Sequence, residues 1–257
     1  MLIDTLAIKS NRWRETRRAI RFGFRVQFSR RATGHTHGGE RLHGNAVCAG
    51  CRKPLRLVWD INLQDPSLTP LLPEILVGQS RLPLYYCFNC PEATWYRISS
   101  GGQLKVFGRH DDRNSSETLY GSERVVPEIL PRRHLKLSKL PSLIDGLICL
   151  ETSLSEIDPS GLEFLSQYLG NKVEGACNLK LSQFGGSPRM IQGHMDHCRC
   201  INPKCRSQRY RSWPAFCVKE IAYVERDGLD GFEWAYAPLT FHICWVCGAI
   251  RGDFQCD

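Results

Sequence analysis

The cysteines of this 257-residue chain constrain its fold more than any other feature. There are 13 of them, and most lie in close groups: Cys48/Cys51, Cys87/Cys90, Cys198/Cys200/Cys205 and Cys244/Cys247. Two cysteines on one tight turn place both sulfurs on the same side, and two such turns together give the tetrahedral thiolate set that zinc prefers. A chain of this length buries a core without disulfides, and no signal peptide is evident. We therefore expect metal ligation in a reducing, cytoplasmic location.

The spacing of the cysteines predicts two zinc sites. The first consists of Cys48, Cys51, Cys87 and Cys90. The second is assigned to Cys200, Cys205, Cys244 and Cys247, because Asn202 and Pro203 make the 200–205 segment turn-forming. Cys198, His194 and His197 lie close enough in sequence to replace one of these ligands, and that alternative stays open. A closed set of four sulfurs leaves no coordination position for water or substrate, so we expect two structural Zn²⁺ ions.

The same series of motifs, a double glycine followed by two cysteine pairs, occurs twice along the chain. In the first half, Gly38-Gly39 precedes the 48–51 cysteine pair, and 35 residues separate Cys51 from Cys87. In the second half, Gly185-Gly186 precedes Cys200 and Cys205, and 38 residues separate Cys205 from Cys244. A double glycine, a cysteine pair, a spacer of similar length and a second pair in the same order indicate an internal duplication.

Hydrophobic patterning predicts a mainly β chain with a few helices. Strands are expected over 20–28, 55–61, 82–88, 218–224 and 239–243, and helices over 11–18 and 159–169. The turn-rich segment 107–130 is predicted to be a linker. We therefore divide the chain into a basic N-terminal helix or arm (1–18), a first repeat with a zinc site (19–106), the linker, and a second repeat with a zinc site (131–257). The predicted class is α+β, predominantly antiparallel β, internally duplicated, with two zinc-ribbon-like insertions.

Positive charge is concentrated at the N-terminus. The chain has a net charge of +8, and residues 1–41 hold ten Lys/Arg against three acids, or +7. A basic segment of this kind contacts nucleic acid in many proteins. The candidate contacts are Arg12, Arg14, Arg17, Arg18, Arg30 and Arg31. The alternative is that part of this charge is the solvent-exposed face of the strand over 20–28.

Three segments carry a resemblance to a known family. Residues 135–145, the helix ending at Tyr168-Leu169, and residues 181–192 with their Gly-Gly turn together resemble the YwqG-like bacterial family of unknown function. The cysteine-bounded segment 48–90 is similar to the programmed cell death protein 2 and Tsr-type ribosome-biogenesis proteins. The resemblance implies a duplicated, mostly antiparallel β structure that holds a partner protein, since the eukaryotic members of this group chaperone a ribosomal protein.

These features favour a binding protein over an enzyme. The sequence contains no P-loop, nucleophile elbow, His-Glu-x-x-His or dinucleotide fingerprint, and no apolar run long enough to span a membrane. We expect a zinc-stabilised, non-catalytic protein-interaction module, either an escort or an immunity-type antagonist. The alternative is a nucleic-acid-binding zinc-ribbon protein that uses the basic N-terminal segment.

Overall fold

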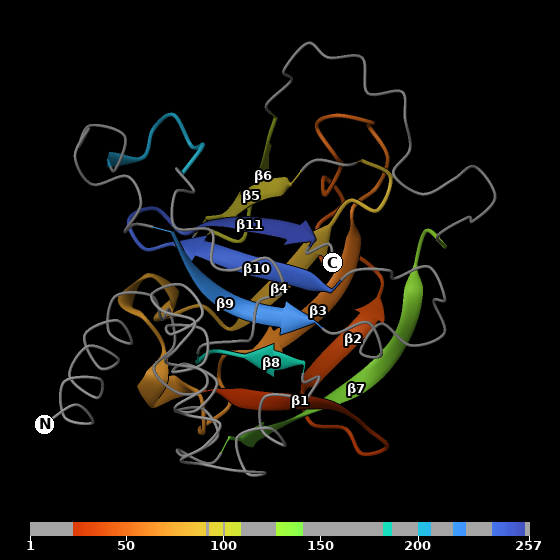
Figure 1. The fold of residues 1–257 in the computed structure, drawn as a ribbon, viewed down its shortest axis with the longest axis vertical. Coiled ribbons are helices and arrows are strands. Elements are labelled where there is room, and N and C mark those ends of the chain that lie inside the picture. Colours follow the sequence, from red (N-terminus) through yellow and green to blue (C-terminus); the bar gives the residue numbers. More distant parts are fainter. Residues whose placement is uncertain are drawn as a thin grey trace, which may run out of the picture.

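The structure, a computed structural model, describes residues 23–90, 93–99, 101–108, 127–140, 182–186, 200–206, 218–224 and 238–254. These residues form one 11-stranded sheet (Figure 1), and every strand pair in it is antiparallel. The strands are β1 (Phe24–Ser29), β2 (His35–Gly39), β3 (Arg56–Asn62), β4 (Arg81–Tyr86), β5 (Thr94–Ile98), β6 (Leu104–Phe107), β7 (Leu130–Lys139), β8 (Gln183–Phe184), β9 (Val218–Val224), β10 (Leu239–Cys244) and β11 (Ala249–Phe254). Two short 3-10 helices, η1 (Thr69–Leu71) and η2 (Glu74–Leu76), lie between β3 and β4.

The expected fold class is confirmed in its coarser part. The sheet is predominantly antiparallel β, and the described residues are nearly all β, with the two 3-10 turns as their helical content. The helices expected over 11–18 and 159–169 lie outside the described residues. Separate zinc-ribbon insertions are not seen in the part of the chain that the structure describes. Cys244 is the last residue of β10 and Cys87 directly follows β4, so these cysteines continue strands of the main sheet.

The strand order has an internal correspondence. It runs β4-β3-β2-β7-β1-β8-β9-β10-β11-β5-β6. If β7, β8, β9 and β10 are treated as the equivalents of β1, β2, β3 and β4, the first eight strands of this order are the same when read from either end. The two halves are interleaved, because β1 pairs with β7 and β8 while β7 pairs with β1 and β2. The centre of this correspondence therefore lies between β1 and β7.

A β-bulge occupies the same place in both halves. Val58 is the extra residue of β3, between the pairs Leu57–Tyr85 and Trp59–Leu84. Ile221 is the extra residue of β9, between the pairs Glu220–His242 and Ala222–Phe241. Each bulge lies opposite the residues two and three positions before a cysteine, Cys87 or Cys244. Because a bulge bends its strand and increases the twist, both bulges act on the strand pairs that carry the cysteines.

The sheet curls on itself around an aromatic core. In Figure 1, β3 and β4 lie behind β9 and β10, and a close approach of β11 to β4 joins these layers. A Cβ added at Gly252 in β11 would lie 2.9 Å from the Phe241 ring and 3.2 Å from the Tyr86 ring of β4. Glycine at this position therefore allows β11 to approach β4. Phe24, Trp59 and Phe184 also lie in the core, each at most 2% exposed.

Strand β3 differs from its prediction in one respect. The alternation over 55–61 predicts a strand with one solvent-exposed face, yet the side chains from Arg56 to Ile61 are all buried. Its polar residues are compensated, since Asp60 pairs with Arg81 and the Arg56 guanidinium donates to the carbonyls of Pro54 and Pro127. The period-two pattern identified the strand but could not show that its polar face is covered.

Candidate metal centres

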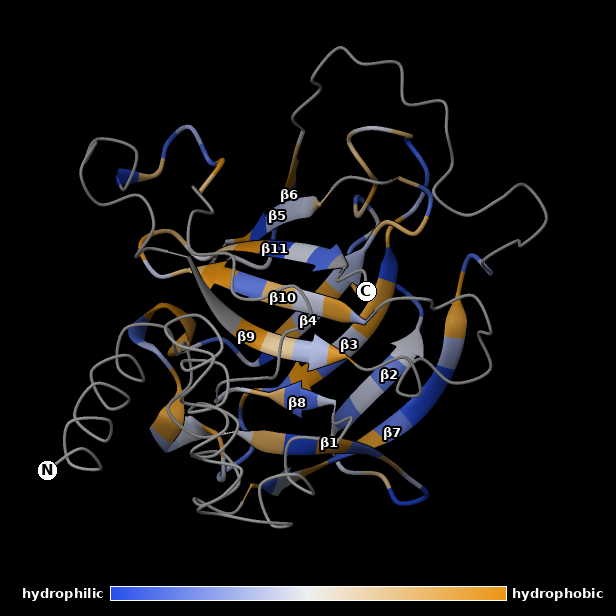
Figure 2. Cartoon of the chain, in the orientation of Figure 1, coloured by the Kyte–Doolittle hydropathy of each residue, from blue (hydrophilic) through white to orange (hydrophobic). Residues whose placement is uncertain are grey.

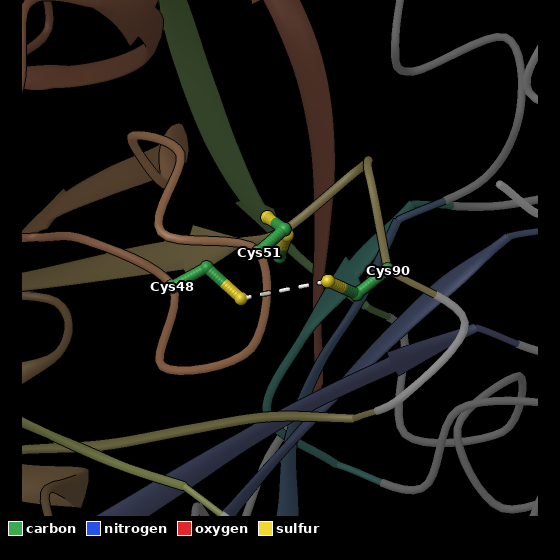
Figure 3. A group of neighbouring side chains, drawn as sticks. Cys48, Cys51 and Cys90 are labelled. Carbon is green, nitrogen blue, oxygen red and sulfur yellow. Dashed lines mark hydrogen bonds between the residues drawn. The ribbon is translucent and has the colours of Figure 1, made fainter. Parts of the chain in front are cut away.

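The first cysteine group joins two distant turns. Cys48 and Cys51 lie on a short hairpin closed by hydrogen bonds between Cys48 and Lys53 and between Leu55 and Ala46. Cys87 and Cys90 lie on the turn that follows β4. In Figure 3, the sulfurs of Cys48 and Cys90 face each other, and Cys51 lies beside them. All four sulfurs lie within 4.8 Å of one another.

The second cysteine group has the same plan. Cys244 and Cys247 lie on the turn between β10 and β11, and Cys200 and Cys205 come from a separate turn. These four sulfurs also lie within 4.8 Å of one another, and all four residues are buried. They pack with Trp95 of β5 and Ala249 of β11 in a small core of their own. A tryptophan from the first half of the chain therefore covers the cysteine group of the second half.

The sulfur–sulfur distances fit a tetrahedral metal site. The Cys48–Cys90 and Cys51–Cys87 sulfurs lie 3.7 and 3.6 Å apart. The corresponding distances in the second group are 3.5 Å for Cys200–Cys247 and 3.7 Å for Cys205–Cys244. Zinc–sulfur bonds of about 2.3 Å place tetrahedral ligands about 3.8 Å apart, whereas a disulfide needs about 2.05 Å. The two groups could thus each hold one metal ion, as the cysteine spacing predicts.

Two of the turns share a backbone conformation that holds their cysteines. The N–H of Arg52 donates to the Cys48 carbonyl at 3.1 Å, and the N–H of Gly248 donates to the Cys244 carbonyl at 2.8 Å. The donor residues have φ values of +60° and +70°. Arg52 is the one non-glycine residue with positive φ in the described residues. This left-handed closure positions the 48–51 and 244–247 sulfurs in the same way.

Hydrogen-bond donors surround the sulfurs. The backbone N–H groups of Gly50 and Cys51 donate to Cys48, and that of Asn89 donates to Cys87. In the second group, the backbone N–H of Asn202 donates to Cys200 and its side-chain amide to Cys247. Asn202 also accepts the N–H of Lys204 on its side chain and that of Cys205 on its carbonyl. Such donors favour the thiolate form, which is the form that binds metal.

The pKa values of the cysteines show which thiols of the first group are stable as thiolates without a metal ion. A hydrogen bond from Cys87 lowers the pKa of Cys48 to about 5, against the opposing effect of burial. The pKa of Cys87 is raised by the same hydrogen bond, and burial raises the pKa of Cys90 to about 12. The first group on its own thus stabilises one thiolate. A divalent cation stabilises all four, because its charge outweighs their mutual repulsion.

A buried arginine adds positive charge beside the first group. Burial lowers the pKa of Arg56, while the neighbouring Cys87, Glu128 and Cys51 act in the opposite direction. Arg56 is 6% exposed and pairs with Tyr86, the residue before Cys87. A metal ion with four thiolates carries a net charge of −2, which a nearby cation offsets.

The first group is more accessible than the second. Cys51 and Cys90 are half-buried, whereas every cysteine of the second group is buried. Gly50 lies against the sulfurs of the first group, because a Cβ added there would come within 3.4 Å of the Cys90 sulfur. Solvent therefore reaches the first group past Cys51 and Cys90.

The other predicted site residues divide into two sets. Arg30 and Arg31 are exposed in the turn after β1. The alternative ligands Cys198, His194 and His197 and the candidate contacts Arg12, Arg14, Arg17 and Arg18 lie outside the described residues. Sequence reasoning did not single out Arg56 or the bonding of Asn202 to the sulfurs. The basic residue five positions after Cys51 is a weak signal, and nothing in the sequence shows that it folds back on the cysteines.

Comparisons with known proteins add no relative. No family model matches the chain, and neither a curated protein nor a solved structure shows significant similarity to it. The resemblance to the YwqG-like and programmed cell death protein 2 groups therefore stays a prediction. Among the described residues, no helix has the length and apolarity that crossing a membrane requires.

Proposed function

We propose that this chain is a non-catalytic scaffold that binds a protein partner and is stabilised by two structural zinc ions. The observation that carries the proposal is the gathering of eight cysteines into two closed four-sulfur groups. Four thiolates in a tetrahedron suit zinc, and they leave no position for a substrate on the metal. The zinc ions would then contribute folding free energy, and they would hold distant turns together.

Two of the three histidines that shortly precede Cys48 in the sequence, His35 and His43, are engaged in hydrogen bonds of the fold. His35 is 1% exposed and both of its ring nitrogens are engaged: Nδ1 accepts the N–H of Asn62 at 3.1 Å, and Nε2 donates to Asp65 at 2.9 Å. His43 is hydrogen-bonded to the Tyr85 hydroxyl at 2.9 Å. A histidine with both nitrogens held in this way supports the loop and has no lone pair left for a general base or a ligand.

A duplication is part of the proposal. The matching strand order, the two equivalent bulges and the shared closure of the 48–51 and 244–247 turns all support it. A reducing, cytoplasmic location also belongs to the proposal, because thiolates that bind metal must be protected from pairing.

Exposed apolar side chains beside the second group support a protein partner. Val77 is 65% exposed and Val246 is 42% exposed. They belong to adjoining segments, since Ile75 lies 3.3 Å from the position that a Cβ of Gly248 would take. Apolar side chains gathered on a surface in this way are typical of sites that bind protein.

The test combines metal analysis with partner recovery. Native mass spectrometry of the full chain should find two zinc ions, and optical absorption distinguishes colourless zinc from iron. A tagged chain, expressed in its own organism, should recover a protein in stoichiometric amount. Val77→Asp/Val246→Asp should lose that protein, while Leu42→Asp/Ile129→Asp, which alters two equally exposed apolar residues elsewhere, should retain it. Fewer than two metal ions, or partner recovery that both variants preserve, would contradict the proposal.

A further inference from the structure

Strands β1 and β7 lie side by side at the centre of the sheet and carry an unusual charge. Residues 24–31 and 130–139 contain seven Lys/Arg and no Asp/Glu. We call these seven residues the basic ribbon: Arg25, Arg30, Arg31, Arg132, Arg133, Lys136 and Lys139. All seven are exposed, and Figure 2 shows much of β7 in the hydrophilic colour.

The register of the two strands sets which residues share a face. Arg25, Gln27 and Ser29 lie opposite Ser138, Lys136 and His134. Directly opposed residues of an antiparallel pair point to the same side, so this face is polar along its whole length. The other face carries Phe24, Val26 and Leu135, which are buried in the core. By the same register, Lys139 lies opposite Phe24 and Arg133 lies opposite His37 on this second face, at the margin of the core. Core packing therefore fixes the orientation of the polar face.

Five of the seven basic residues form no ion pair within the described residues. The ion pairs there join Arg41 to Glu128, Arg81 to Asp60, Arg251 to Asp253 and His35 to Asp65. Arg25, Arg30, Arg31, Arg132 and Lys136 take part in none of them. Concentrated charge of one sign, held on a rigid sheet, attracts a ligand of the opposite sign.

The ribbon exists because the two halves interleave. Arg25, Arg30 and Arg31 come from the N-terminal half, whereas the four basic residues of β7 come from the second half. Residues 42–257 have a net charge of only +1, so the basic residues of β7 do not stand out in the net charge of this part of the sequence. Pairing of β1 with β7 places Arg25 of the first half and Lys136 of the second half on the same polar face, at the centre of the correspondence between the halves.

We propose that the basic ribbon binds the phosphate backbone of a nucleic acid. Alternate residues of a strand lie about 6.7 Å apart, so His134, Lys136 and Ser138 of β7 present a regular row of polar side chains along an extended polyanion. Contacts of this kind hold nucleic acid without reading its sequence. Gln27 and Ser138, which share this face with Arg25 and Lys136, add neutral donors of the kind that contact phosphate and sugar oxygens.

This surface is independent of the zinc sites and of the protein partner proposed above. Its ligand is recognised by charge, and none of the eight cysteines belongs to it. A chain that binds two zinc ions but no nucleic acid would leave the proposed function intact and overturn this inference alone.

Fluorescence anisotropy of the full chain with a 20-nucleotide single-stranded RNA and with a 20-base-pair DNA duplex tests the inference. Arg25→Gln/Lys136→Gln removes two charges from the polar face. Arg97→Gln/Lys105→Gln removes two exposed charges on β5 and β6 and is the matched control. We expect about tenfold weaker binding for the first variant and a slope of log affinity against log salt reduced by about 1.5 to 2. The control should bind within about twofold of the unaltered chain.

The two probes separate the sources of phosphate. Tighter binding of either probe supports the ribbon and shows whether its ligand is single-stranded or duplex. Binding that both variants reduce equally, or that does not depend on salt, would overturn the inference. So would loss of binding in Arg12→Gln/Arg14→Gln/Arg17→Gln/Arg18→Gln but not in Arg25→Gln/Lys136→Gln. Vesicles containing phosphatidylserine that bind through the ribbon, when neither nucleic acid does, would assign it to a membrane surface. Metal content confirms that each variant is folded.

Discussion

The side-chain hydroxyl of Tyr96 in β5 accepts the backbone N–H of Tyr85 in β4 at 2.9 Å. The same hydroxyl donates to the carbonyl of Pro83 at 3.0 Å. Strand β4 lies at one edge of the sheet, and no strand of the described residues pairs with it on this side. A single buried side chain therefore satisfies two backbone groups that a further strand would otherwise pair.

Removing this hydroxyl should destabilise the fold. Tyr96→Phe keeps the ring and leaves a buried N–H and a buried carbonyl without partners. We expect a loss of about 2 to 3 kcal/mol in the free energy of unfolding, measured by urea denaturation. A loss below about 0.5 kcal/mol for Tyr96→Phe would mean that water replaces the hydroxyl at this edge.

Each cysteine group should account for one metal ion. Cys87→Ser and Cys244→Ser should each lower the metal content by about one ion, because a closed site does not tolerate loss of a thiolate. Either substitution should also strongly destabilise the fold. Cys198→Ser should retain both ions, since the second group already has four sulfurs without it. Loss of an ion in Cys198→Ser would instead assign Cys198 as a ligand.

Arg52 and Gly248 should respond oppositely to substitution. Both residues close a cysteine turn with positive φ, a conformation that disfavours residues with a Cβ. Arg52→Gly should therefore raise the free energy of unfolding by up to about 1 kcal/mol, and Gly248→Ala should lower it by at least as much. Thermal unfolding of the zinc-loaded protein measures both. Destabilisation by Arg52→Gly would show that the arginine side chain contributes more than its backbone strain costs.

Arg56 should slow the release of metal from the first group. Arg56→Gln removes the buried charge beside four thiolates and should accelerate zinc transfer to a coloured chelator by about tenfold, since altering a residue behind the ligands typically costs 10- to 100-fold in affinity. The transfer rate of Arg56→Lys should lie between those of the unaltered chain and Arg56→Gln, because lysine keeps the charge but loses the planar donor geometry. Arg97→Gln, an exposed arginine on β5, is the control. Equal rates for all variants would exclude an electrostatic role.

Buried His37 should make the fold sensitive to mild acid. Burial, and then the charge of Arg133, lowers its pKa from 6.5 to about 4, so the unfolded chain binds a proton that the folded chain rejects. Stability is fully present above pH 6.5 and should fall by up to about 1.4 kcal/mol per pH unit between 6.5 and 4. Urea unfolding at pH 7, 6 and 5 measures this slope. His37→Gln should reduce it; an unchanged slope would assign the acid sensitivity to other groups.

Much of the framework was predictable from local patterns. Period-two alternation located β1 and β3, an apolar run located β4, and the predicted bounds of β9 and β10 are nearly those observed. Five strands were not predicted, namely β2, β5, β6, β8 and β11, because short segments such as Thr94–Ile98 have no alternation that separates them from a loop. Part of strand β7 was singled out only by the family resemblance over residues 135–145. Its ten residues mix basic and apolar side chains whose pattern makes sense only beside β1.

The sequence alone determined the two candidate four-cysteine groups, although it left Cys198, His194 and His197 open as alternative ligands of the second. Cysteine spacing is a local property, and four thiolates can satisfy a tetrahedral ion in few ways, so the pattern of pairs was sufficient for the first group. Tertiary structure decided what surrounds those groups and what lies on the surface. Whether Arg56 adjoins the cysteines, whether Tyr96 completes the edge of β4, and whether the charges of β1 and β7 combine all depend on pairings between segments far apart in the chain. Such pairings follow from the register of the whole sheet, because a shift of one residue between two strands moves every side chain to the opposite face. No local pattern contains that information.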